Sequence, residues 1–178
     1  MSQNYDFKTL SPPEFEALCV ELTAAELELP FETFAEGRDR GIDGRNEHDG
    51  RNIIVQAKHF RNSTWENLQK AAEDESKNLK TLNPERYIFT TSQPLTPDRK
   101  EKLKTALNHP SVSVGDIWGQ TELNALLQKH PDRALDVEHR SSSHPAQQPY
   151  YCRISGDPLR YQTHDEGLRC DPRRGPGA

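Results

Sequence analysis

The sequence predicts a mixed α/β layer structure, with helices flanking a central β-sheet. Two observations support this prediction: helix-capping motifs recur along the chain, and short apolar runs with the character of strands lie between them. The expected order is helix, three strands, helix, strand, helix, strand, helix, which is typical of a layered α/β fold. A chain of 178 residues is long enough to bury one core of ordinary size.

The first expected helix spans residues 12–27. Ser11-Pro12-Pro13-Glu14 is a capping box with proline at the first helical position, and apolar side chains then recur at helical spacing. Pro30 ends this helix, and residues 31–35 are expected to form the first strand.

The next two strands are expected at residues 42–46 and 52–57, joined as a hairpin around Glu47-His48-Asp49-Gly50. The second strand is apolar on both faces until Gln56, which predicts a central position in the sheet. The polar side chains of Gln56 and Lys58 at its end are therefore conspicuous.

The second expected helix begins at the capping box Ser63-Thr64-Trp65-Glu66 and ends near residue 82, with Glu75 interrupting its apolar side. Residues 86–91 are expected to form a strand, and Thr96 to cap a helix that ends at residue 107.

The last elements of the predicted domain are a short strand over residues 112–117 and a helix capped by Thr121 and ended by Pro131. We expect a domain at residues 1–135 and a disordered tail or linker at residues 136–178. The tail contains five prolines after His139 and few aliphatic residues, so burial would not offset its conformational entropy. A hydrophobic content of 32% and a mean hydropathy of -0.96 agree with a partly unpacked chain.

Asp43, Gln56 and Lys58 form the candidate functional site. Asp43 is expected at the start of one hairpin strand, and the period of two places Gln56 and Lys58 on one face of the other. A carboxylate, an amide oxygen and an ammonium group in one small space suit a hard cation, a water and a phosphate. Each residue alone also has a structural explanation: a turn-forming aspartate, a hydrogen-bonded edge glutamine and a solvated lysine.

Charge and composition restrict the partners and the compartment. The formal net charge of -5 argues against a uniformly basic surface, but residues 37–62 contain six Lys or Arg against four Asp or Glu. No stretch is apolar enough to span a membrane, and the opening residues lack the apolar core of a signal peptide. The three cysteines have no metal-site spacing, so we expect a reducing cytoplasm.

These motifs together resemble the Mrr-like restriction endonuclease domain of the PD-(D/E)XK nuclease superfamily. The resemblance covers residues 5–131 and rests on Phe15-Glu16, on Gly37-Arg38-Asp39-Arg40-Gly41-Ile42-Asp43 and on Val55-Gln56-Ala57-Lys58. In that branch, glutamine replaces the usual carboxylate before the lysine. The resemblance implies a restriction-endonuclease-like three-layer fold with a central mixed sheet flanked by helices.

The resemblance also implies roles for individual residues. Asp43 matches the main metal ligand, Gln56 a second ligand through its amide oxygen, and Lys58 the catalytic lysine; Glu16 matches a helical glutamate that completes many such sites. The Ala57 carbonyl is a further candidate ligand. The implied cofactor is Mg²⁺, with Mn²⁺ as a substitute.

Basic side chains flank the site and are candidates to grip DNA phosphates. Ordinary surface charge is the alternative interpretation of each. Besides Arg51 and His59, the candidates are Arg38, Arg40, Arg45 and Arg61.

The leading hypothesis is a metal-dependent DNA endonuclease, an effector module of restriction or antiviral defence. The alternative is a catalytically silent DNA-binding or protein-interaction module on the same fold, which Gln56 and the net acidity favour. A ribonuclease or junction-resolving enzyme differs only in substrate. No recognition domain is visible, so we expect a homodimer or a partner that senses the target.

Overall fold

The computed structural model describes residues 4–33, 42–48, 50–60 and 64–133. The chain divides into two units, residues 1–141 and 142–178, and every element described below belongs to the first. The predicted tail at residues 136–178 lies outside the described residues, so the predicted boundary at residue 135 stays a prediction. No helix in the described part is long and apolar enough to cross a membrane.

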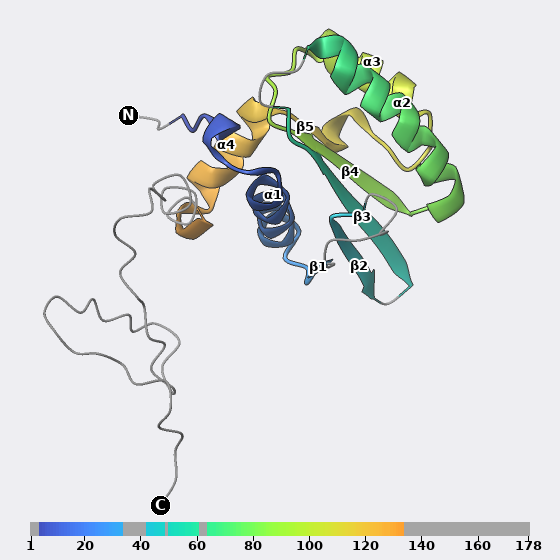
Figure 1. Ribbon diagram of the computed structural model, residues 1–178. Helices are drawn as coiled ribbons and strands as arrows, with labels where there is room; N and C mark the ends of the chain where they lie inside the picture. The colour runs from blue at the N-terminus through green and yellow to red at the C-terminus, as the bar shows by residue number, and fades with distance from the viewer. Residues whose placement is uncertain (1–3, 34–41, 49, 61–63, 134–178) are drawn as a thin grey trace, which may run out of the picture. The chain divides into compact units, whose positions relative to one another are not determined.

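The centre of the domain is a five-stranded sheet in the order β1-β2-β3-β4-β5. Strands β1 to β3 pair antiparallel, whereas β3, β4 and β5 pair parallel, so the sheet is mixed. The strand predicted to be central is β3, the third of five (Figure 1). The strands are β1 (Glu32–Thr33), β2 (Gly44–His48), β3 (Arg51–Lys58), β4 (Arg86–Thr91) and β5 (Ile117–Trp118).

Helices cover both faces of this sheet, which gives three layers. Helices α1 (Pro12–Leu27) and α4 (Gln120–Lys129) pack with the β3 side chains Ile53, Val55 and Ala57 in one buried cluster. Helices α2 (Trp65–Leu82) and α3 (Pro97–Leu107) pack with Ile54 in a second cluster on the other face (Figure 1). The predicted three-layer α/β fold is therefore confirmed.

Helix α1 has the predicted bounds, and its capping box is formed. The Ser11 hydroxyl accepts a hydrogen bond from the Glu14 backbone N–H at 3.4 Å, and the Glu14 carboxylate accepts from the Ser11 N–H at 2.7 Å. The helix ends at Leu27, and its C-cap residue Glu28 has a left-handed φ of 53°. A short 3₁₀ helix, η1 (Phe7–Thr9), precedes α1.

The hairpin of β2 and β3 is confirmed, with Gly44 opposite Val55, but β2 begins later than predicted. Residues 42 and 43 precede the strand, which extends instead to His48. Gly50 has a φ of 77°, a conformation that favours glycine in the turn. Strand β1 begins one residue later than the predicted 31–35, and its predicted end at residues 34 and 35 lies outside the described part of the chain.

Three further elements match their predicted ends, with one difference at a cap. Helix α2 ends at Leu82, and β4 and α3 have the predicted bounds; Thr96 accepts a capping hydrogen bond from the Arg99 N–H at 3.3 Å. The N-cap of α2 is Thr64 rather than Ser63, a residue outside the described ranges.

The strand predicted over residues 112–117 is wrong for most of its length. Residues Val114–Asp116 form a second 3₁₀ helix, η2, and only Ile117 and Trp118 join the sheet. The Asp116 carboxylate accepts hydrogen bonds from the Ser113 N–H and hydroxyl at 3.3 and 2.5 Å and from Arg86 Nε at 2.8 Å. These side-chain bonds favour a turn over an extended strand.

Helix α4 begins at Gln120, two residues earlier than the predicted Thr121 cap implies. Its N-cap is Gly119, whose backbone N–H donates to the Glu122 carboxylate at 2.8 Å. The helix ends at Lys129, just before Pro131.

Candidate active site

Asp43 lies where the chain enters β2 and is held by the end of β3. Its backbone N–H donates to the Val55 carbonyl at 3.2 Å, which extends the hairpin pairing by one residue. Its Oδ2 accepts hydrogen bonds from Gln56 Nε2 at 2.9 Å and from the Ala57 N–H at 2.6 Å. The hairpin thus brings Asp43 and Gln56 into direct contact, as the sequence predicts.

Gly44, the residue after Asp43, allows α1 to pack closely against this end of β2. A Cβ atom at residue 44 would lie 2.8 Å from both Cγ atoms of Val20. Carbon atoms in contact normally stay about 3.5–4.0 Å apart, so a side chain here would push α1 away. Helix α1 carries the candidate Glu16, so glycine at residue 44 sets the spacing between that helix and the Asp43 strand.

Gln56 is buried, with 2% of its surface exposed, and only one end of its amide is satisfied. The Nε2 donates to Asp43, whereas the buried Oε1 has no hydrogen-bond partner among the residues that the structure describes. Buried polar atoms are almost always paired, so this oxygen, which lies beside a carboxylate, is a candidate contact for a cation or a water.

Lys58 follows Gln56 by two residues and lies on the same face of β3, toward α2. Its Nζ is 2.8 Å from Glu75 Oε1, and only 23% of its side chain is exposed. The ammonium group is therefore held by an ion pair rather than extended freely into water, as the structural explanation of a solvated lysine would require.

Glu75 is a residue of this site that the sequence-based reasoning did not select. It is 7% exposed on α2, in a stripe of buried residues that includes Ala72 and Leu79. Its second carboxylate oxygen accepts from Asn78 Nδ2 at 3.0 Å. The interruption of an apolar helix stripe by an acidic residue was the available signal, but its pairing with Lys58 depends on how α2 crosses β3.

The charges of this region shift the pKa values of two buried side chains, Cys19 and Tyr87. Burial raises the pKa of the Cys19 thiol; a hydrogen bond from Thr90 lowers it, and the carboxylates of Asp43 and Glu16 raise it. Burial likewise raises the pKa of Tyr87, and the charges of Glu75 and Asp43 add to this. The charge of Asp43 thus acts both on a buried thiol of α1 and on a buried hydroxyl of β4. Contact of Glu16 with a metal stays a prediction.

The predicted DNA-contacting arginines are only partly placed. Arg45 lies on β2 and pairs with Glu32 at 3.6 Å and with Glu47 at 3.2 Å. Arg38, Arg40 and Arg61 lie outside the described residues, as does the whole segment 37–41.

The donor set fits a hard cation that keeps several waters. Among the described residues there is no cluster of three or more His, Cys, Asp or Glu side chains. Asp43 supplies one carboxylate, and Gln56 Oε1 is the unpaired oxygen next to it. Magnesium is commonly bound by one or two protein groups together with water and substrate phosphate, so this set is sufficient.

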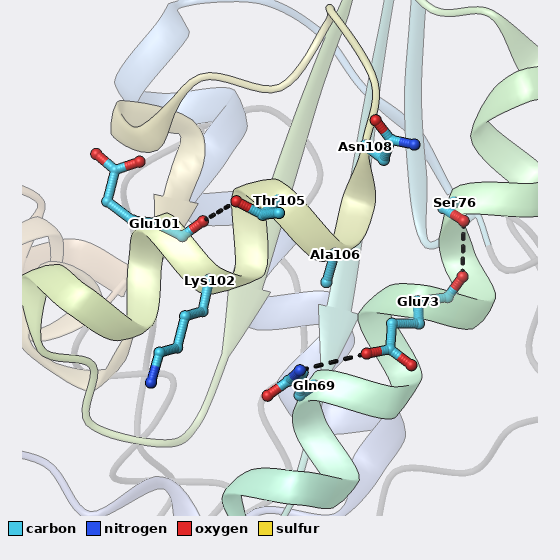
Figure 2. Close-up of a pocket in the computed structure, with 8 residues that line it drawn as sticks. All are labelled: Gln69, Glu73, Ser76, Glu101, Lys102, Thr105, Ala106 and Asn108. Atoms are coloured by element: carbon cyan, nitrogen blue, oxygen red, sulfur yellow. Dashed lines mark hydrogen bonds between the residues drawn. The ribbon is translucent and has the colours of Figure 1, made fainter.

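A groove of about 500 Å³ lies elsewhere, between α2 and α3 (Figure 2). In the close-up the Gln69 amide points toward Glu73, and the two hydrogen-bond at 3.3 Å. None of Asp43, Gln56 and Lys58 lines this groove, so it is separate from the candidate site.

A mixed sheet covered by helices on both faces, with Asp43 and Gln56-Ala57-Lys58 on its hairpin, is typical of nucleases with a restriction-endonuclease-like fold. The sequence profile of the Mrr-type catalytic domain, described as a restriction endonuclease, matches residues 7–112, and the chain belongs to this family of nucleases. The chain is also 43% identical over 128 residues to "Uncharacterized protein y4cD" of Sinorhizobium fredii (strain NBRC 101917 / NGR234). That match covers 72% of this chain and 20% of the relative, so the chain corresponds to about a fifth of the relative's length.

Proposed function

We propose that this domain is a metal-dependent endonuclease that hydrolyses phosphodiester bonds of DNA, as an effector module of restriction or antiviral defence. The observation that carries the proposal is the buried Oε1 of Gln56, which lies beside the Asp43 carboxylate and has no hydrogen-bond partner within the described ranges. A bound cation would satisfy both oxygens, whereas a purely structural hairpin gains nothing from an unpaired buried amide oxygen.

Asp43 is the proposed main ligand of Mg²⁺, with Mn²⁺ as a substitute, and Gln56 Oε1 is the second ligand. The Ala57 carbonyl is a further oxygen at the same end of β3, and Glu16 is the acidic group that α1 adds. When bound, the cation would lower the pKa of a coordinated water and offset negative charge on the phosphate.

Lys58 acts on the substrate side of this centre. Its ammonium group carries three donors and is held 2.8 Å from Glu75. We assign it two tasks: to hold a non-bridging phosphate oxygen as charge grows there, and to orient the attacking water. Both tasks need a fixed, charged group at the end of β3.

Basic side chains around the hairpin supply the proposed DNA contacts. Arg38, Arg40 and Arg61 flank the site in sequence, and Arg45 lies on β2. The partners of Arg45, Glu32 and Glu47, are exposed, and such surface pairs contribute only about 0–1 kcal/mol. Arg45 can therefore exchange them for a phosphate at little cost.

Target choice requires more than this site. We propose that a second copy of the chain or a sensing domain or protein supplies it, and that the reaction takes place in the cytoplasm. A single centre cuts one strand at a time, so a homodimer accounts most simply for a double-strand break.

A plasmid assay tests the proposal. Supercoiled DNA is incubated with the protein in Mg²⁺, in Mn²⁺ and in chelator, beside Asp43→Ala and Lys58→Ala. Lys77→Ala serves as the matched control, because Lys77 is exposed and pairs only with the exposed Asp74 among the described residues. We expect metal-dependent nicking that both site variants lose and the control keeps. Wild-type nicking by folded Lys58→Ala would reject the assignment, and a matched RNA substrate separates the two nucleic acids.

A catalytically silent module is the second candidate. Two features of Gln56 favour it. Its Nε2 donates a hydrogen bond to Asp43 Oδ2, and its side chain replaces the second carboxylate that is usual in the PD-(D/E)XK superfamily. DNA binding that persists in chelator, with intact plasmid in Mg²⁺ and Mn²⁺, would support this candidate over the nuclease.

A further inference from the structure

Glu75 occupies a buried position, where an apolar side chain would require less desolvation free energy. It lies on α2 four residues before Leu79 and three after Ala72, both fully buried, and is itself 7% exposed. Moving a carboxylate out of water costs a large desolvation free energy, which is recovered only through close partners of opposite charge and further hydrogen bonds. The stripe alone gives no reason for an acid at this position.

Both oxygens of the Glu75 carboxylate have a partner. Oε1 is 2.8 Å from Lys58 Nζ, and Oε2 accepts from Asn78 Nδ2 at 3.0 Å. Asn78 is three residues further along α2, so helix geometry presents it to the same carboxylate. The carboxylate is thereby fixed from its own helix before it meets Lys58.

The ion pair restricts the most flexible group of the candidate site. A lysine side chain has four rotatable bonds and loses considerable entropy when one position is imposed on it. The ion pair with Glu75 fixes the Lys58 ammonium group within the fold. Lys58 lies two residues after Gln56, on the same face of β3. Two donors of the ammonium group are left for a phosphate oxygen and a water.

We propose that Glu75, supported by Asn78, is the positioning residue for Lys58, an inference that rests on the proposed nuclease function of Lys58. Glu75 pairs with the ammonium group and does not itself touch the substrate. The helix between β3 and β4 thereby contributes to a site whose other members come from the hairpin and α1.

The test compares Glu75→Gln and Glu75→Met with the wild-type chain. Glutamine keeps the size of the side chain but removes the charge and one of the two acceptor oxygens. Methionine fits the apolar stripe of α2 if glutamine impairs folding. The matched control is Asp74→Asn, the neighbouring exposed acid that pairs with Lys77 at 3.1 Å. Lys77 and Lys58 also allow comparison of an exposed and a held lysine in one molecule.

Two readouts are needed. The first is brief acylation of lysines by a trace amine-reactive reagent, with the modified positions quantified by mass spectrometry. We expect Lys58 to react several-fold faster in both Glu75 variants and unchanged in Asp74→Asn, with the exposed Lys104 of α3 as the internal reference. The second is plasmid nicking, where we expect kcat to fall about 10- to 100-fold with KM changed less than about threefold.

The outcomes distinguish failure of the positioning role of Glu75 from failure of the proposed nuclease function. Unchanged Lys58 acylation in both Glu75 variants overturns the positioning role, whatever the plasmid shows. Wild-type kcat in both variants, with nicking lost in Lys58→Ala, also overturns it while leaving the nuclease intact. If the wild type does not nick DNA, the proposed function fails, and the acylation comparison still decides whether Glu75 holds Lys58.

Discussion

The side-chain amide of Gln56 donates a hydrogen bond of 2.9 Å to Asp43 Oδ2 and leaves its own oxygen buried without a partner among the described residues. A carboxylate in place of this amide would repel Asp43 when no metal is bound. Glutamine therefore stabilises the metal-free hairpin, at the expense of one negative charge at the proposed cation site.

The first prediction concerns Gln56→Glu. A second carboxylate raises the charge of the donor set, so we expect the Mg²⁺ concentration for half-maximal nicking to fall roughly tenfold. In chelator, the buried pair of like charges should lower the free energy of unfolding by about 1–3 kcal/mol, and saturating Mg²⁺ should restore it. Thermal unfolding with and without Mg²⁺ measures both effects.

Gln128→Glu is the control for this substitution, because Gln128 is exposed on α4. Its melting temperature should change little, and equally in Mg²⁺ and chelator. A Gln56→Glu protein that unfolds at the same temperature in Mg²⁺ and in chelator would contradict a cation site at Asp43 and residue 56.

The second prediction concerns the contact between Gly44 and Val20. A methyl group at residue 44 would lie 2.8 Å from the Val20 Cγ atoms. Overpacking of this kind typically costs about 1–3 kcal/mol, so Gly44→Ala should lower the denaturation midpoint by a corresponding amount. Urea unfolding followed by circular dichroism gives the free energy.

The double variant Gly44→Ala, Val20→Ala tests the stated cause. Removing the Val20 methyl groups makes room for the new one, so the double variant should be more stable than the sum of the single effects predicts, by about 1 kcal/mol. Simple additivity would show that the loss in Gly44→Ala comes from the backbone and not from α1.

Much of this fold could be predicted from local patterns. The bounds of α1, β4 and α3 depend on capping residues and apolar periodicity close in sequence, and these were predicted correctly. The region before β5 was not, because its turn depends on Asp116, which bonds both to the neighbouring Ser113 and to the distant Arg86. The apolar residues of this region alone did not show that the hydrogen bonds of Asp116 would favour a turn over a strand.

In the candidate site, too, a contact within the hairpin was predictable, whereas a contact between a strand and a distant helix was not. Contact between Asp43 and Gln56 follows from a hairpin with a short turn, so residue spacing was enough to predict it. The Lys58–Glu75 pair joins a strand to a helix across the layer, with a separation that no local pattern encodes. An acid within an apolar helix stripe marked Glu75 as unusual but did not identify its partner.

The third prediction concerns Tyr87, whose hydroxyl is buried without a hydrogen-bond partner among the described residues. Tyr87→Phe removes only that oxygen, so at neutral pH we expect stability to stay equal or to rise by up to about 1 kcal/mol. Circular dichroism in urea at pH 7 measures this difference.

The same substitution should change the response to alkali. Burial, then the charges of Glu75 and Asp43, raise the pKa of Tyr87 well above the ordinary tyrosine value of 10.0. The unfolded chain therefore releases this proton near pH 10 while the folded protein retains it, and the stability present below pH 10 is lost as pH rises further. Each such group contributes a slope of about 1.4 kcal/mol per pH unit above its unfolded pKa.

At pH 11 the wild type should thus have lost about 1.4 kcal/mol more than Tyr87→Phe. Cys19, whose pKa is also raised by burial, leaves both proteins with a similar decline from about pH 9. Parallel stability curves for the two proteins between pH 9 and 11 would show that the hydroxyl of Tyr87 ionises as easily in the fold as in water.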